Sequence, residues 1–173
     1  LIKPSKMEVN VEESDGRKGI LTAEPLERGF GLTLGNSIRR ILLSSLQGAA
    51  ITSVKMKGVV HEFSTIPGVK EDLTDILLNL KAVAVKVHSP GLKKMYLKST
   101  GSGELRAGNF ETDSETEIMN PDQIIMTLDS NADIEIEANV ETGKGYVTAE
   151  VAEDDEKVIG EIKLDAMFSP VIK

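Results

Sequence analysis

The chain has 173 residues, of which 40% are apolar and 28% are charged, as is typical of globular proteins. It contains no cysteine, which excludes disulfides and thiolate chemistry, and no apolar run near the roughly 18 residues that a membrane-spanning helix needs. The net charge of −8 is uneven: residues 1–103 carry 15 basic and 10 acidic side chains, whereas residues 104–173 carry 5 and 18. Because the acidic part would repel nucleic-acid phosphates, the sequence indicates a poor DNA-binding protein.

The first element predicted along the chain is a β-hairpin. Val9 and Val11 alternate with polar residues before a turn at 14–16, and residues 20–24 read as the returning strand. Alternation on both sides of a Gly-containing turn is typical of a hairpin.

A helix is predicted over residues 34–46, because its apolar side chains recur at three- and four-residue spacing. Thr33 is expected to cap its beginning and Gly48 to stop it. A half-buried strand at 51–57 and a second amphipathic helix at 69–81 follow.

Beyond the second helix the pattern favours strands. They are predicted at 83–87, 95–97, 124–128, 134–140 and 162–164, with a turn at 143–145 and an acidic loop at 153–157. The order of strands, helix, strand, helix and many strands predicts an α+β fold and not a series of βαβ units.

Glycines at 29, 31 and 35 follow a strand and open a helix, as phosphate-binding loops do. Their spacing is one residue longer than the dinucleotide fingerprint, and no Gly-Lys-Ser/Thr follows. Two interpretations stay open. The glycines allow tight backbone packing at the start of the helix, or the Gly29–Gly35 loop binds a phosphate or nucleotide in an enzyme.

Other candidate sites lack essential residues. Residues 129–133 begin like a calcium loop but lack its glycine and its final glutamate, so they favour the acidic tip of a hairpin. His61 and His88 are isolated in the sequence. We therefore expect no metal, no cofactor and no catalytic constellation.

One helix face stands out by its composition. On the 34–46 helix, Leu43 lies opposite the apolar stripe and one turn from Arg39 and Arg40. A leucine beside arginines is typical of a protein interface, although single exposed leucines are also common. Leu78 lies off the stripe of the second helix in the same way, and Lys81 ends that helix, where a cation suits the helix dipole.

The segment from Glu24 to Ser45, EPLERGFGLTLGNSIRRILLSS, resembles the signature of the bacterial DNA-directed RNA polymerase alpha subunit. Further resembling segments occur in the family's order: HEFST at 61–65, GVKED at 68–72, ILLNLK at 76–81, GKGYV at 143–147 and FSPV at 168–171.

The resemblance implies the amino-terminal region of that subunit. It predicts a partial dimerisation domain at 1–47 plus 170–173, interrupted by an inserted β-rich domain at 48–169. The implied function is a non-catalytic assembly platform of a nucleotidyltransferase complex. Such a subunit homodimerises, gathers the beta and beta-prime subunits for transcription, and works in the cytoplasm with the nucleoid.

The resemblance also implies roles for individual residues. Arg40 and Leu43, with the adjacent Arg39, match the beta contact, and Lys81 and Leu164 match the beta-prime contact. No membrane contact is expected, and no direct DNA contact, because the family's DNA-binding domain lies beyond the matching segments. The residues expected to form the apolar seam of the homodimer are Phe30, Leu34, Ile38, Ile41 and Leu42. An unrelated acidic β-rich adaptor remains a different hypothesis, which predicts no polymerase subunits in a pulldown.

Overall fold

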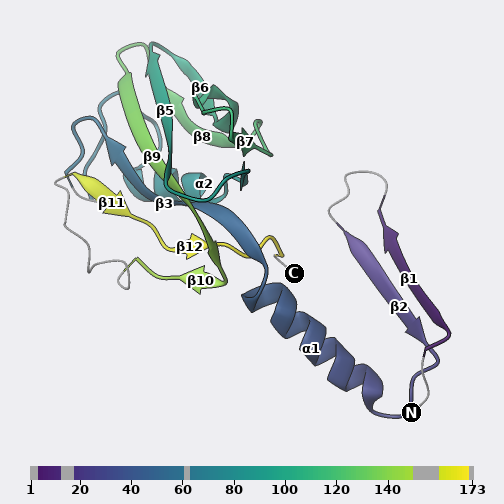
Figure 1. Ribbon diagram of the computed structural model, residues 1–173. Coiled ribbons are helices and arrows are strands. Elements are labelled where there is room, and N and C mark those ends of the chain that lie inside the picture. The colour runs from purple at the N-terminus through teal and green to yellow at the C-terminus, as the bar shows by residue number, and fades with distance from the viewer. Residues whose placement is uncertain (1–3, 13–17, 61–62, 150–159, 172–173) are drawn as a thin grey trace. The chain divides into compact units, whose positions relative to one another are not determined.

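The structure, a computed structural model, describes residues 4–12, 18–60, 63–149 and 160–171 (Figure 1). Its contacts divide the chain into two compact units, Leu1–Leu42 and Leu43–Lys173. The expected grouping of residues 170–173 with residues 1–47 stays a prediction.

The first unit contains the predicted hairpin. Strand β1 (Lys6–Val11) pairs antiparallel with β2 (Gly19–Glu24), and the predicted turn at 14–16 lies outside the described residues. Directly opposed residues share a face of the hairpin, and Val9 is opposite Leu21. Both side chains are exposed, so this apolar face is not covered within the described part of the chain.

Helix α1 (Phe30–Ser44) begins before the predicted start. The expectation that Thr33 caps the helix is wrong, because Thr33 lies inside it and its amide donates to the carbonyl of Gly29 at 3.4 Å. Gly29 has a φ of +88°, a backbone conformation that glycine adopts without strain. The chain therefore turns at Gly29 and the helical hydrogen bonds begin directly after it.

The expectation that Gly48 stops this helix is also wrong. Helix α1 ends at Ser44, and Gly48 lies in the next strand, β3 (Gln47–Met56). A Cβ added at Gly48 would lie 1.9 Å from the carbonyl oxygen of Phe168. Glycine is needed here because another backbone segment passes against the strand.

The second unit is α+β, as predicted, and every pairing among its described strands is antiparallel. The main sheet has the order β5-β9-β3-β4-β7, and β11 pairs with β3 on the same edge as β4 but farther along the strand; β6–β8 and β10–β12 form separate pairs (Figure 1). Besides β3, its elements are α2 (Leu73–Lys81), β4 (Val85–Val87), β5 (Lys93–Thr100), β6 (Gly103–Arg106), the 3-10 helix η1 (Ala107–Asn109), β7 (Thr116–Ile118), β8 (Ile124–Leu128), β9 (Asp133–Lys144), β10 (Tyr146–Val147), β11 (Glu161–Lys163) and β12 (Ala166–Met167).

Helix α2 is shorter than the predicted 69–81 helix. Its N-cap is Asp72, whose carboxylate accepts the backbone N–H of Asp75 at 2.9 Å. Val69 forms an isolated β-bridge with Leu128 instead of belonging to the helix. The helix begins at Leu73 because the Asp72 side chain satisfies a backbone donor that would otherwise have no partner in the first turn.

Two predictions in the acidic part need correction. Residues 129–133 are not the tip of a hairpin, because β8 pairs with β6 whereas β9 pairs with β3 and β5. The turn predicted at 143–145 is narrower, since β9 continues through Lys144 and only Gly145, with a φ of +67°, separates it from β10. The predicted acidic loop at 153–157 lies outside the described residues.

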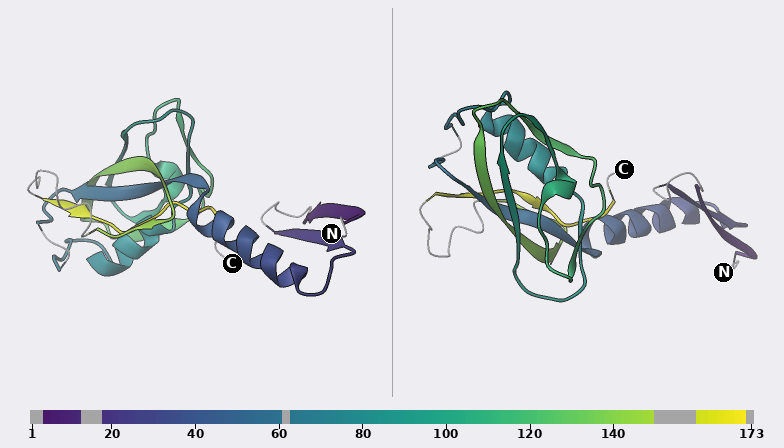
Figure 2. Two further views of the ribbon diagram at one scale, coloured as in Figure 1. Left: turned by 60° about the horizontal axis from the view of Figure 1, so that its bottom comes forward. Right: turned by 90° about the horizontal axis from the view of Figure 1, so that it is seen from above.

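The core lies between α2 and one face of the main sheet (Figure 2). Alternate residues of β9 point into it, which leaves the acidic residues between them on the outer face. The side chains that α2 and β9 bury there are Leu73, Ile76, Leu77, Leu80, Ile134, Ile136, Ala138 and Val140.

We predict that Leu80→Ala lowers the free energy of unfolding by about 2–5 kcal/mol, because Leu80 has no exposed surface and its truncation leaves a cavity. The matched control is Leu78→Ala on the same helix. The Leu78 side chain is 57% exposed, so its truncation should lower the free energy of unfolding by less than about 0.5 kcal/mol. Urea unfolding of both variants measures the difference. Equal losses would contradict the assignment of α2's buried face.

Candidate interaction surfaces

Helix α1 carries apolar side chains that the described residues of its own unit do not bury. The structure describes all of α1, and none of its residues is buried. Ile41 is 54% exposed, Phe30 and Leu34 are also exposed, and Ile38 and Leu42 are half-buried. We call these five residues the dimer stripe. Their accessibility satisfies the first requirement for an apolar seam, while the seam itself stays a prediction.

The second predicted surface of α1 is the arginine ridge, defined as Arg39, Arg40 and Leu43. Both arginines are exposed, whereas Leu43 is half-buried. Within the second unit, Leu43 and Ser44 lie beside Gly145, since a Cβ added at Gly145 would lie 3.9 Å from the carbonyl oxygen of Leu43. Arg40 and Leu43, three residues apart, lie on the same side of the helix.

The glycine-rich segment does not form a phosphate-binding loop. Gly31 and Gly35 both lie inside α1, so their backbone belongs to a regular helix and not to an open cradle. The sharp entry expected by the other interpretation is present at Gly29, while the close packing around these glycines is not seen among the described residues. A Cβ added at Gly29, Gly31 or Gly35 meets no described atom within 4 Å.

The structure brings Lys81 and the segment around Leu164 together. Leu164 is only 8% exposed and belongs to the hydrophobic core. Its neighbour Asp165 faces outward and forms an ion pair with Lys81, with 3.4 Å between Nζ and Oδ2. The two residues predicted to contact beta-prime therefore lie close together, with Lys81 at the surface and Leu164 in the core. Their role in that contact stays a prediction.

Asp165 is held by more than this ion pair. The Ala149 backbone N–H donates to its Oδ1 at 3.0 Å, and the Tyr146 hydroxyl also donates to its carboxylate. These two hydrogen bonds and the nearby Lys81 ammonium lower the pKa of the Asp165 carboxyl. The bond to Asp165 in turn raises the pKa of the Tyr146 hydroxyl. Each effect follows from stabilising one protonation state through a hydrogen bond.

Sequence reasoning missed Asp165 and Tyr146 as surface residues. Residues 164–168 alternate in burial: Leu164, Ala166 and Phe168 are buried, while Asp165 and Met167 face outward. The even positions of this segment are all apolar, and one odd position is an acid. This period-two pattern could have indicated that Asp165 and Met167 face outward. The partner of the acid could not have been found, because Lys81 and Tyr146 are distant in the sequence.

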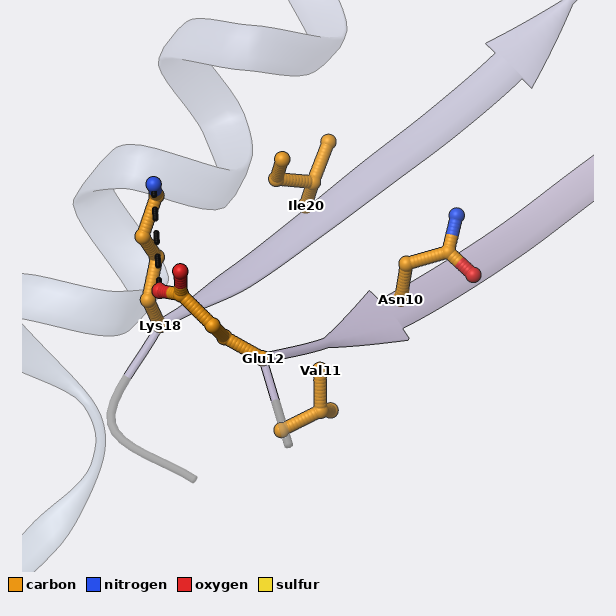
Figure 3. A pocket seen from close by; sticks show the side chains of 5 residues that line it. All are labelled: Asn10, Val11, Glu12, Lys18 and Ile20. Carbon is orange, nitrogen blue, oxygen red and sulfur yellow. Dashed lines mark ion pairs between the residues drawn. The ribbon is translucent and has the colours of Figure 1, made fainter. Parts of the chain in front are cut away.

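A shallow hollow lies at one end of the hairpin (Figure 3). Its only ion pair among the described residues joins Lys18 and Glu12 at 3.8 Å, and Val11 and Ile20 supply exposed apolar surface beside it. Two paired charges and aliphatic groups supply no nucleophile or metal-binding set. The hollow therefore suggests no chemistry.

The two histidines are the side chains whose isolation in the sequence predicts no metal site. His88 Nε2 lies 3.7 Å from a Glu117 carboxylate oxygen, while His61 lies outside the described residues. Within the described ranges, no group of three or more His, Asp or Glu side chains could hold an ion. No helix in those ranges is long and apolar enough to cross a membrane.

A family model described as "RNA polymerase Rpb3/RpoA insert domain" matches residues 54–169. The matched range covers β3 from Val54 onward and every later strand of the second unit. It includes Lys81, Tyr146, Leu164 and Asp165, and does not include α1.

We predict that Tyr146→Phe raises the pKa of Asp165 toward its ordinary value of 3.8, because it removes one donor and leaves the Ala149 N–H. The folded state gains stability from the lowered pKa above pH 3.8, and this gain is lost as the pH falls through the lowered value. Carboxyl 13C NMR titration measures the shift. Tyr96→Phe, on β5, is the control, and an unchanged Asp165 titration in Tyr146→Phe would contradict the network.

Proposed function

Since the chain belongs to the family of alpha-type RNA polymerase subunits that contain the Rpb3/RpoA insert domain, we propose that it is a non-catalytic assembly platform of that enzyme. Two copies pair, and the pair gathers the beta and beta-prime subunits into a transcribing polymerase. Membership of the family implies other polymerase subunits as partners; the particular partners belong to this proposal.

The observation that carries the proposal is the exposure of α1. An amphipathic helix ordinarily buries its apolar side, yet the fully described α1 buries no residue. The same holds for the apolar face of the hairpin around Val9 and Leu21. Uncovered apolar surface of this kind supports a partner, and a homodimer about a two-fold axis needs one self-complementary seam.

The arginine ridge supports capture of beta. Arg40 supplies a guanidinium that can bind a carboxylate in a bidentate manner, and Leu43 supplies apolar area on the same side of α1. Full burial of such a leucine contributes about 1.5–3 kcal/mol. An arginine and a leucine presented together therefore suit a small, specific contact.

The contact with beta-prime is proposed on the other surface. Lys81 is partly exposed at the end of α2, and Leu164 is buried directly before Asp165, the residue that pairs with Lys81. Because two identical chains meet two different large subunits, each copy would use one of these surfaces and leave the other unused. This division explains how a symmetric pair supports an asymmetric enzyme.

The proposal assigns no catalytic step to this chain and places its work in the cytoplasm. The alternative of a phosphate-binding enzyme is not favoured, since the glycine-rich segment lies in a helix. An acidic adaptor unrelated to polymerase is not favoured either, because the family match covers most of the second unit.

We predict that Ile41→Glu converts the dimer to monomers, because a two-fold seam would bury two unpaired carboxylates facing each other. Ile41 is exposed in the single chain, so the fold should tolerate the change. Leu32→Glu is the control, since Leu32 is 74% exposed on the opposite side of α1. Sedimentation of the full-length subunit gives the readout, and a dimeric Ile41→Glu variant would refute the seam.

We predict that Arg40→Ala and Leu43→Ala each weaken binding of beta by about 2 kcal/mol, or roughly 30-fold, while dimerisation is unchanged. The control is Arg106→Ala, an exposed arginine on β6 paired with Glu104. Co-elution and titration of beta with the full-length dimer measure the effect. Wild-type affinity in both α1 variants would remove the ridge from the beta contact.

A further inference from the structure

The outward side of β12 and of the two residues before it forms a surface with the end of α2. Tyr146 is opposite Met167 in the β10–β12 pair, so their side chains share one face, and Asp165 lies two residues before Met167 on that face. Lys81 reaches this face through its ion pair with Asp165, and Leu78 lies one helical turn before Lys81. We call these five residues the Lys81 patch.

The Lys81 patch has the composition of an interface and not of an ordinary charged surface. Leu78, Tyr146 and Met167 are each about half exposed or more. Tyrosine and methionine are enriched at protein interfaces, and here they surround a single ion pair. Leu164 lies in the core between β11 and β12, where it can act on a partner only by holding this segment in place.

Asp165 is the fixed point of the patch. Its carboxylate accepts hydrogen bonds from the Ala149 backbone N–H and the Tyr146 hydroxyl, and it also forms the ion pair with Lys81. A lysine side chain on its own has many rotamers, and ordering it upon binding opposes association. An acid already fixed by two other donors restricts Lys81 to one region, while the remaining N–H donors of its ammonium can still reach a partner.

We propose that Asp165 is a positioning residue, which holds the Lys81 ammonium in place for the beta-prime subunit, while the Tyr146 hydroxyl helps to fix the Asp165 carboxylate. This inference rests on the proposed function, because it takes Lys81 as the residue that touches beta-prime. It gives Leu164 a supporting place in the core beside Asp165.

The test is a double-mutant cycle with Asp165→Asn and Lys81→Met in the full-length subunit. Asparagine keeps an oxygen that can accept the Ala149 N–H, but it has no charge with which to hold Lys81. The affinity of beta-prime is measured by titration onto the complex of the subunit dimer with beta. Melting temperatures show whether each variant stays folded.

We expect Asp165→Asn to weaken beta-prime binding by about 2- to 10-fold, the cost of ordering one long side chain. In the Lys81→Met background, Asp165→Asn should have no further effect, because there is no ammonium left to position. A merely structural role would weaken binding equally in both backgrounds. Tyr146→Phe should give a smaller loss that is also absent without Lys81.

The outcomes separate this inference from the proposed function. If Lys81→Met weakens binding and Asp165→Asn does not, or if the two effects add, the positioning role is refuted and the Lys81 contact stands. If Lys81→Met binds beta-prime as the wild type does, the proposed contact itself is refuted and the inference with it. The matched control is Asp133→Asn, which breaks the ion pair with Lys57 at the opposite end of β9 and should not change binding.

Discussion

The antiparallel pairing of β3 with β9 is the constraint on which the second unit depends. It runs from Gln47 opposite Lys144 to Met56 opposite Ile136, the longest pairing among the described strands. At one end of this pairing, Gly145, directly after β9, lies beside Leu43 and Ser44. On the side of β3 away from β9 lies β11, which leads into the segment with Asp165 and then into β12. The position of the Lys81 patch therefore depends on this pairing.

The pairing of β9 with β5 accounts for part of the uneven charge of the chain without any nucleic acid. Acidic residues of β9 alternate with its core residues and lie on the outer face, where Glu137 is paired with Lys94 and Glu135 with Lys98 of β5. Lysines of the basic first part thus lie beside acids of the acidic second part on neighbouring strands. These pairs are exposed, so each adds little stability.

The two proposed contact surfaces differ in how they are built. The arginine ridge consists of neighbours on one helix, so its geometry follows from helical periodicity alone. The Lys81 patch needs α2, β10 and β12 to meet, and its ion pair joins residues 84 positions apart. A local change in α1 can therefore alter the ridge without moving the rest, whereas the Lys81 patch depends on the whole fold of the second unit. A partner that binds the Lys81 patch therefore recognises the folded second unit and not a linear sequence motif.

The sequence by itself determined the hairpin, both helices and most long strands, because hydrophobic period and turn residues are local properties. It also determined the resemblance to RNA polymerase alpha subunits, and with it the residues predicted to contact other subunits. Only the tertiary structure decided that Gly48 lies in a strand against Phe168, and that Leu164 is buried while Asp165 faces Lys81. Such facts require strands from distant parts of the chain to pair, and no local pattern encodes the partner of a strand or the register in which it pairs.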